Sequence, residues 1–167
     1  MDYNWSAGWR SAITAGVVVG ILAAVPLLGT LCCLWTLGGG AMAIVLYRRN
    51  SGQPVVPVSI GFRTGVLTGL VGFAVDSLAQ IFKLISNGGA AQRAAFKEAI
   101  DKSIARGSQD PQAVALMQRF AEWIQSPQGF AIMFTFSLLM LGIGFILFTG
   151  IGGVLGASLF GKPDSRR

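Results

Sequence analysis

The chain has 167 residues, of which 53% are hydrophobic and only 12% are charged. A soluble domain normally carries about 25% charged residues because its surface faces water, so this composition predicts a polytopic membrane protein. The net charge is +6. The basic residues flank apolar runs and form no continuous stripe, which argues against nucleic-acid binding.

The composition also limits the chemistry. The chain contains no histidine, the commonest general base and metal ligand. Its cysteines, Cys32 and Cys33, are adjacent within an apolar run, where thiols usually behave as small inert hydrophobic groups. Because no nucleophile–base pair or cluster of metal ligands is apparent, we expect no enzyme, no catalytic residues, no metal and no cofactor.

The chain opens with a predicted interfacial N-terminus, residues 1–10, whose tyrosine and tryptophans suit the headgroup region. Residues 11–49 are predicted to form a first transmembrane hairpin. The run from Ser11 to Tyr47 holds no acidic or basic residue, and as one helix it would measure about 55 Å. The hydrocarbon core is only about 30 Å thick, so the run must cross twice, with a turn at Pro26.

Two segments follow the hairpin. Residues 50–63 are predicted to be a cytoplasmic linker, extended because of its prolines and turn formers. Residues 64–85 are predicted to be a third span. Positions four apart on one face of that span form a polar and small stripe: Thr64, Thr68, Gly72, Asp76 and Gln80, with Lys83 about a turn farther on.

Residues 86–127 are predicted to be an extracytoplasmic helical insert. A first amphipathic helix, supported by the pairs Lys97–Asp101 and Glu98–Lys102, ends at Gly107. A second begins at Pro111 and turns Val114, Met117, Phe120 and Ile124 inward. Three interpretations stay open: the insert lies on the outer leaflet with its apolar face down, it docks a partner, or it is a lid over the bundle.

Residues 128–161 are predicted to be a fourth span, and residues 162–167 a basic tail. The apolar run from Ala131 to Phe160 would measure about 45 Å as a helix, which exceeds the hydrocarbon thickness. We expect its first turns to project beyond the bilayer, and the alternative is a bend at its glycines.

Small residues recur every fourth position in the expected spans, and such faces let a neighbouring helix backbone approach closely. The predicted packing residues are Gly16, Gly20, Gly40, Gly69, Gly72, Gly153 and Ala157. These faces exceed what one bundle needs for its own contacts, which predicts packing with further copies or with other membrane proteins.

The arginines predict the orientation. Arg10 precedes the first span and Arg48 with Arg49 follows the second, whereas the turn between them carries no base. By the positive-inside rule both flanks face the cytoplasm. With four spans, both termini are then cytoplasmic.

Asp76 is the candidate functional residue. A carboxylate near the middle of a span costs about 2.5–3.5 kcal/mol on insertion scales, so it must be neutralised or paired. One interpretation is a proton or cation site that Asp76 forms with Thr68, Gln80 and Lys83. The other is a structural clamp, in which protonated Asp76 hydrogen-bonds to Thr36, Thr149 or a backbone carbonyl, while Lys83 reaches the interface.

The stretch MQRFAEWIQSPQGFAI, residues 117–132, leads into the last apolar run. Here the chain resembles a bacterial family of small four-helix integral membrane proteins, a domain of unknown function. The layout is similar: two spans, a third, a charged helical insert ending in a Ser-Pro step, and a glycine-containing fourth span closed by basic residues. The chain departs from it in its glycine-rich second span and its Cys-Cys pair. The resemblance implies a bacterial inner membrane and four spans, without any activity.

The sequence therefore predicts an all-α membrane four-helix bundle with an extramembrane amphipathic hairpin between spans three and four. Its expected partners are the lipid bilayer and either itself or other membrane proteins, with no nucleic acid. The leading functional hypothesis is a non-enzymatic structural or assembly protein, or an accessory subunit of a larger membrane complex. The alternative is a small oligomeric carrier or channel for ions or protons that uses Asp76.

Overall fold

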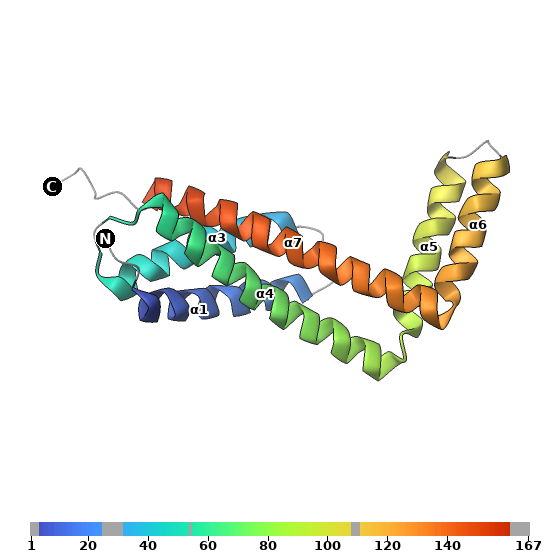
Figure 1. Ribbon diagram of the computed structural model, residues 1–167, viewed down its shortest axis with the longest axis horizontal. Coiled ribbons are helices and arrows are strands. Elements are labelled where there is room, and N and C mark those ends of the chain that lie inside the picture. The colour runs from blue at the N-terminus through green and yellow to red at the C-terminus, as the bar shows by residue number, and fades with distance from the viewer. Residues whose placement is uncertain (1–3, 25–31, 54, 108–110, 161–167) are drawn as a thin grey trace. The chain divides into compact units, whose positions relative to one another are not determined.

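The computed structural model describes residues 4–24, 32–53, 55–107 and 111–160. Nearly all of them are helical, and none of them forms a strand, which confirms the all-α prediction (Figure 1). The helices are α1 (Trp5–Ala24), α3 (Cys32–Ser51), α4 (Val58–Asn87), α5 (Ala90–Gly107), α6 (Pro111–Gln125) and α7 (Pro127–Phe160).

The chain divides into two compact units. The bundle unit comprises Met1–Ala79 and Met140–Arg167, and the hairpin unit comprises Gln80–Leu139. The boundaries fall within α4 and α7, so each of these helices contributes to both units.

Three helices in the described chain are long and apolar enough to cross a membrane: α1, α4 and α7. The fourth expected span, α3, is not among them. Its apolar stretch is diluted by the glycines at 38–40 and closes on Arg48 and Arg49. The predicted turn at Pro26 and the predicted basic tail lie outside the described residues.

The helices begin and end at positions that differ from the sequence prediction. Helix α1 begins at Trp5, because the Asn4 side-chain oxygen accepts a hydrogen bond from the Ala7 amide at 3.2 Å and caps the helix. Gly52, with a φ of 66°, ends α3 in the left-handed conformation that suits glycine. Helix α4 begins directly after Pro57, so the predicted linker is shorter than expected and residues 58–63 are helical.

Helices α1 and α4 approach each other at glycines. A Cβ added at Gly16 would lie 2.8 Å from the carbonyl oxygen of Thr68, and one added at Gly20 would lie 2.7 Å from that of Gly72. Real Cβ atoms do not come this close to a backbone oxygen. Glycine at both positions therefore permits the spacing of the two helices.

Helices α4 and α7 meet along two matching ladders. The ladder on α4 is Gly61, Gly65 and Gly69, and the ladder on α7 is Thr149, Gly153 and Ala157. A Cβ added at Gly61 would lie 2.6 Å from the carbonyl oxygen of Gly153. We call this contact the glycine seam.

Helix α3 packs on another side of α7. A Cβ added at Gly40 would lie 2.6 Å from the Gly153 amide nitrogen, and one added at Gly156 would lie 2.7 Å from the Ala41 Cα. The small residues that the sequence singled out thus contact helices of the same chain. They are not surplus, so their abundance gives no reason to expect a second copy.

One end of the bundle unit gathers the start of α1, the end of α3, the start of α4 and the end of α7 (Figure 1). The Asn4 amide donates to the Tyr47 hydroxyl at 3.2 Å, and the Arg48 guanidinium donates to the Phe160 carbonyl oxygen at 2.8 Å. An apolar cluster lies between these contacts: Ala7, Ile44, Tyr47, Val56, Ile60 and Ala157. We call this the arginine end, because Arg10, Arg48, Arg49 and Arg63 all belong to it.

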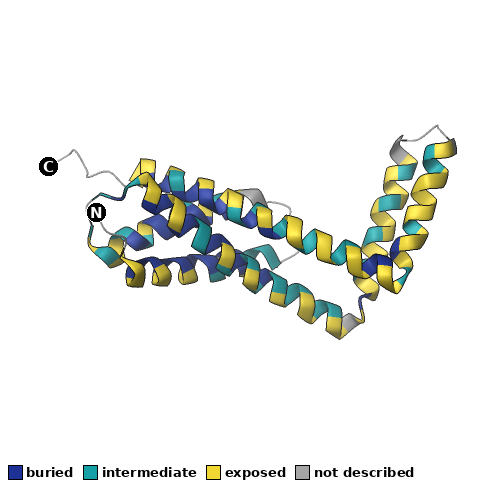
Figure 2. Ribbon diagram, viewed as in Figure 1, coloured by how far each residue is buried: buried dark blue, intermediate teal, exposed yellow. Residues whose placement is uncertain are grey.

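The outward faces of the bundle unit are apolar. Exposed side chains recur every fourth residue along α7 on the face away from the glycine seam: Ile143, Leu147, Ile151 and Leu155. Buried residues concentrate on the facing sides of the helices, as Figure 2 shows. An apolar outer surface, in place of the polar surface of a soluble protein, suits a lipid environment.

The hairpin unit is built around α5 and α6. Gly88 and Gly89, both with positive φ, turn the chain from α4 into α5. The Ser126 hydroxyl accepts a hydrogen bond from the Gly129 amide at 3.0 Å and caps α7, which agrees with the predicted Ser-Pro start. The Arg93 guanidinium lies 5.0 Å from the centre of the Phe130 ring, which holds the start of α5 to α7.

The predicted side-chain pairs and faces of the insert are partly realised. Lys102 pairs with Glu98 at 2.6 Å, whereas Lys97 and Asp101 form no ion pair in the described chain. The hydrogen bond from Lys102, and then its charge, lower the pKa of the exposed Glu98. The stabilisation that this ion pair gives to the folded protein is therefore present above the ordinary glutamate pKa and is lost as pH falls through the lowered value.

Met117 and Phe120, predicted to point inward, are exposed.

The glycine seam makes a stability prediction. Gly153→Ala places a Cβ against the Gly61 carbonyl oxygen, and a backbone atom in a packed helix cannot move away easily. We expect the variant to lose about 1–3 kcal/mol of unfolding free energy, measured by titration with sodium dodecyl sulfate and followed by far-ultraviolet circular dichroism.

Gly144→Ala is the matched control. It lies on the same helix, nothing lies within 4 Å of an added Cβ, and the change raises helix propensity. Equal stability of the two variants would contradict the close packing at Gly153.

Candidate functional site

Helix α4 carries a buried polar face within the bundle unit. Thr64 and Thr68 are fully buried, and Asp76 is only 2% exposed. Gln80 and Lys83 lie beyond Ala79 in the hairpin unit, and each is half-buried. Thr64, Thr68 and Asp76 are the buried polar residues of α4 in the bundle unit. Thr64 precedes Asp76 by twelve residues (76 − 64), about 18 Å of helix, so the three side chains do not form one site.

The threonine hydroxyls are bonded mostly within their own helices. The Thr68 hydroxyl donates to the carbonyl oxygen of Thr64 at 2.8 Å, and the Thr149 hydroxyl donates to that of Phe145 at 2.5 Å. Such bonds satisfy a hydroxyl at membrane depth without a partner from another helix.

Thr64 is the exception. Its hydroxyl oxygen is buried and has no hydrogen-bond partner in the described part of the chain. A buried polar atom left unpaired costs about 1–3 kcal/mol. The hydroxyl can donate a hydrogen bond or offer its oxygen to a cation, so it is a candidate ligand group in its own right.

The structure does not bring Thr149 to Asp76. Thr149 lies beside Gly65 and Gly69. Gly69 precedes Asp76 by seven residues on α4 (76 − 69), which is about 10 Å of helix. A clamp between Asp76 and Thr149 is therefore not formed. Thr36, the other expected acceptor, is buried on α3, and neither it nor Asp76 is without an interaction partner.

The charges of the bundle unit are separated along its length. Asp76 is the acidic residue of its described part, and the arginines belong to the arginine end. Arg63 on the same helix precedes Asp76 by thirteen residues (76 − 63), about 20 Å. At that separation Arg63 does not pair with the carboxylate.

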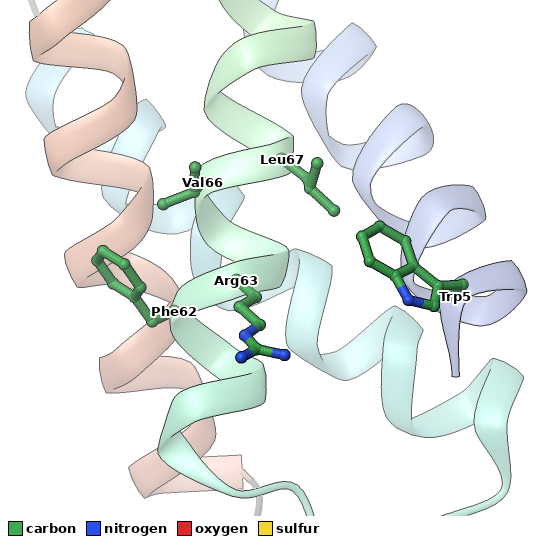
Figure 3. Close-up of a pocket in the computed structure, with 5 residues that line it drawn as sticks. All are labelled: Trp5, Phe62, Arg63, Val66 and Leu67. Atoms are coloured by element: carbon green, nitrogen blue, oxygen red, sulfur yellow. The ribbon is translucent and has the colours of Figure 1, made fainter. Parts of the chain in front are cut away.

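Two grooves lie elsewhere on the protein. One, of about 350 Å³, opens between the starts of α1 and α4 and is lined by Trp5, Phe62, Arg63, Val66 and Leu67 (Figure 3). The other, of about 290 Å³, lies within the hairpin unit and is lined mainly by Phe96, Ile100, Met117, Phe120, Ile124 and Met133. Sequence reasoning found neither, because each depends on which helices are neighbours.

Among the described residues, no group of three or more Cys, Asp or Glu side chains is arranged to hold a metal ion.

The comparisons with known proteins add no relative. No protein-family model matches the chain, no curated protein matches it, and no solved structure matches it.

Proposed function

We propose that the protein is a non-enzymatic integral membrane protein that acts as a structural or assembly factor, or accessory subunit, of a larger membrane complex. The observation that carries this proposal is the exposed apolar face of α6. Leu116 is 70% exposed, Phe120 45% and Trp123 40%, although α6 is not one of the helices apolar enough to cross a membrane.

The arrangement of the bundle unit supports α3 as a fourth span. Helix α3 runs beside α1, and Gly39 faces the Val19 side chain. Its end lies beside the start of α1, where the Asn4 amide bonds to the Tyr47 hydroxyl. Because α3 runs antiparallel to α1 over its length, and α1 is long and apolar enough to cross a membrane, α3 lies at the same depth in the membrane as α1. The low apolarity of α3 follows from its glycines, of which Gly39 faces α1 and Gly40 faces α7.

The proposed location is the inner membrane of a bacterium, with both termini cytoplasmic and the hairpin extracytoplasmic. The gathering of four arginines at one end of the bundle unit supports this orientation by the positive-inside rule. The resemblance noted in the sequence supports the type of membrane.

The exposed face of α6 has the chemistry of a protein-binding surface. Phe120 and Trp123 stack with their ring centres 5.8 Å apart, so the aromatic surface is formed before any partner arrives. Aromatic anchors of this kind dominate the energetics of interfaces. The polar residue Gln118 lies on the opposite side of the same helix and is also exposed.

A photo-crosslinking amino acid in place of Phe120 tests the proposal in native membranes. We expect ultraviolet light to join the protein to a second membrane protein, because a partner covers this face. The same amino acid in place of Gln118 should give little product, since that side faces away.

Three other results would contradict the proposal. Adducts with lipid alone would place α6 on the leaflet surface, an internal crosslink alone would make the hairpin a lid, and equal products from both positions would indicate random collision.

A second candidate function is a carrier for protons or small cations. It is favoured by two buried polar groups at different depths of α4: the Asp76 carboxyl, and the Thr64 hydroxyl, which has no hydrogen-bond partner within the described residues. A transmembrane carboxyl group that exchanges a proton is a common element of transport pathways.

Proteoliposomes that contain a pH-sensitive dye test the carrier hypothesis. Under a potassium diffusion potential, wild-type protein should dissipate a proton gradient. Asp76→Asn should abolish this because the amide cannot ionise, and Thr64→Val should slow it. An intact gradient with wild-type protein, or equal rates for wild-type and a folded Asp76→Asn variant, would contradict the hypothesis.

A further inference from the structure

The groove at the arginine end combines apolar walls with one positive charge. Trp5 on α1 and Leu67 on α4 face each other across it, and the Arg63 guanidinium lies between the same two helices (Figure 3). Val66 and Phe62 extend the apolar lining on α4. Its volume of about 350 Å³ is large enough for part of a hydrocarbon chain.

The described part of this end carries positive charge and contains no acidic residue. Among the described residues, none forms an ion pair or hydrogen bond with the Arg63 side chain. Arg10 and Arg49 are exposed at the same end, and Asp76, the acidic residue in the described part of the bundle unit, is about 20 Å away along α4. An anion from outside the protein is the complementary partner.

We infer that this groove is a binding site for an acidic phospholipid. One acyl chain lies in the groove against Trp5 and Leu67, and the phosphate accepts hydrogen bonds from the Arg63 guanidinium. The ligand class follows from the combination of features. The groove lies between two helices that are long and apolar enough to cross a membrane, so lipid is the molecule that reaches it.

The position of the groove agrees with the depth of a lipid headgroup. Tryptophan and arginine both prefer the interface, where the ring stays apolar on one side and the guanidinium meets phosphate. Trp5 is 67% exposed and Arg63 is exposed, so both are accessible from the bilayer. Arginine is also the side chain best shaped for phosphate, because its planar group donates two parallel hydrogen bonds.

Acidic lipid should bind in preference to zwitterionic lipid. The acyl chains of the two classes are alike, so the apolar walls do not discriminate between them. The net negative charge of an acidic headgroup does discriminate, because it meets the Arg63 guanidinium, which forms no ion pair within the described residues. One basic side chain near the membrane surface corresponds to about a fivefold preference. The inference rests on the membrane placement in the proposed function but not on the protein partner.

Fluorescence quenching by brominated lipid tests the site. A variant that keeps Trp5 and replaces Trp9, Trp35 and Trp123 with phenylalanine is reconstituted into vesicles of phosphatidylcholine and phosphatidylglycerol. The bromines are placed on the acyl chains of either lipid at constant bulk composition. We expect brominated phosphatidylglycerol to quench Trp5 about fivefold more effectively than brominated phosphatidylcholine.

Arginine variants in this background identify the group responsible. Arg63→Gln should bring quenching by the two lipids close to parity, and Arg63→Lys should retain most of the preference because it keeps the charge. Arg49→Gln is the matched control, since Arg49 belongs to the same end of the bundle but does not line the groove. Circular dichroism and gel filtration establish that each variant is folded.

Several results would overturn the inference. Equal quenching of the wild-type groove by both lipids would remove the preference. Equal loss in Arg63→Gln and Arg49→Gln would show only a diffuse accumulation of acidic lipid. A variant that keeps only Trp9 should show a weaker preference for quenching by brominated phosphatidylglycerol. If Trp9 and Trp5 showed the same preference, that result would also contradict a site in the groove. If the protein inserts into vesicles but neither lipid quenches Trp5, protein covers the groove and the membrane placement still stands.

Discussion

The glycine seam between α4 and α7 is the contact on which the bundle unit depends. Lipid chains are as apolar as leucine, so helices inside a bilayer gain little from the hydrophobic effect when they associate. They associate through close van der Waals contact, which requires surfaces without protruding side chains. Gly61 and Gly153 provide this surface, because neither position has room for a Cβ.

The seam also explains the placement of the polar groups. Helix α4 lies between α1 and α7 and is packed by glycines on both sides. A helix so enclosed can keep Thr64, Thr68 and Asp76 away from lipid. The same packing brings the ends of the helices together, so that Arg48 reaches the last carbonyl groups of α7 and Arg63 lies near the start of α1. The buried polar groups of α4, the groove beside Arg63 and the gathering of arginines at one end are thus consequences of one packing arrangement.

Much of the helix content could be predicted, because spacing and apolar length are local properties. The ladder at Thr149, Gly153 and Ala157 was visible as a four-residue repeat. The matching ladder at Gly61 and Gly65 has the same repeat, but the third span was expected to begin only at Thr64. In the sequence Pro57 indicates an extended linker, but it lies directly before Val58, where α4 begins six residues (64 − 58) earlier than expected.

The partners of each small residue could not be predicted. A repeat shows that a helix has a smooth face, but it does not show which helix covers that face, so the sequence alone suggests more small residues than the bundle uses. The same limit applies to Asp76 and Thr149, which belong to the same bundle but lie at different heights along it. It also applies to the groove that Trp5 and Arg63 line. Such neighbours are set by the packing of whole helices.

We propose that α1 and α3 cross the membrane as an antiparallel pair, with the arginine end on one side. Single cysteines at positions 10 and 49, in a chain that carries Cys32→Ser and Cys33→Ser, test it directly with a membrane-impermeant maleimide. Intact spheroplasts and inverted vesicles expose opposite faces of the membrane to this reagent. We predict that both positions are labelled in the same one of these two preparations. Labelling of the two positions from opposite faces would contradict the antiparallel pair and the fourth span with it.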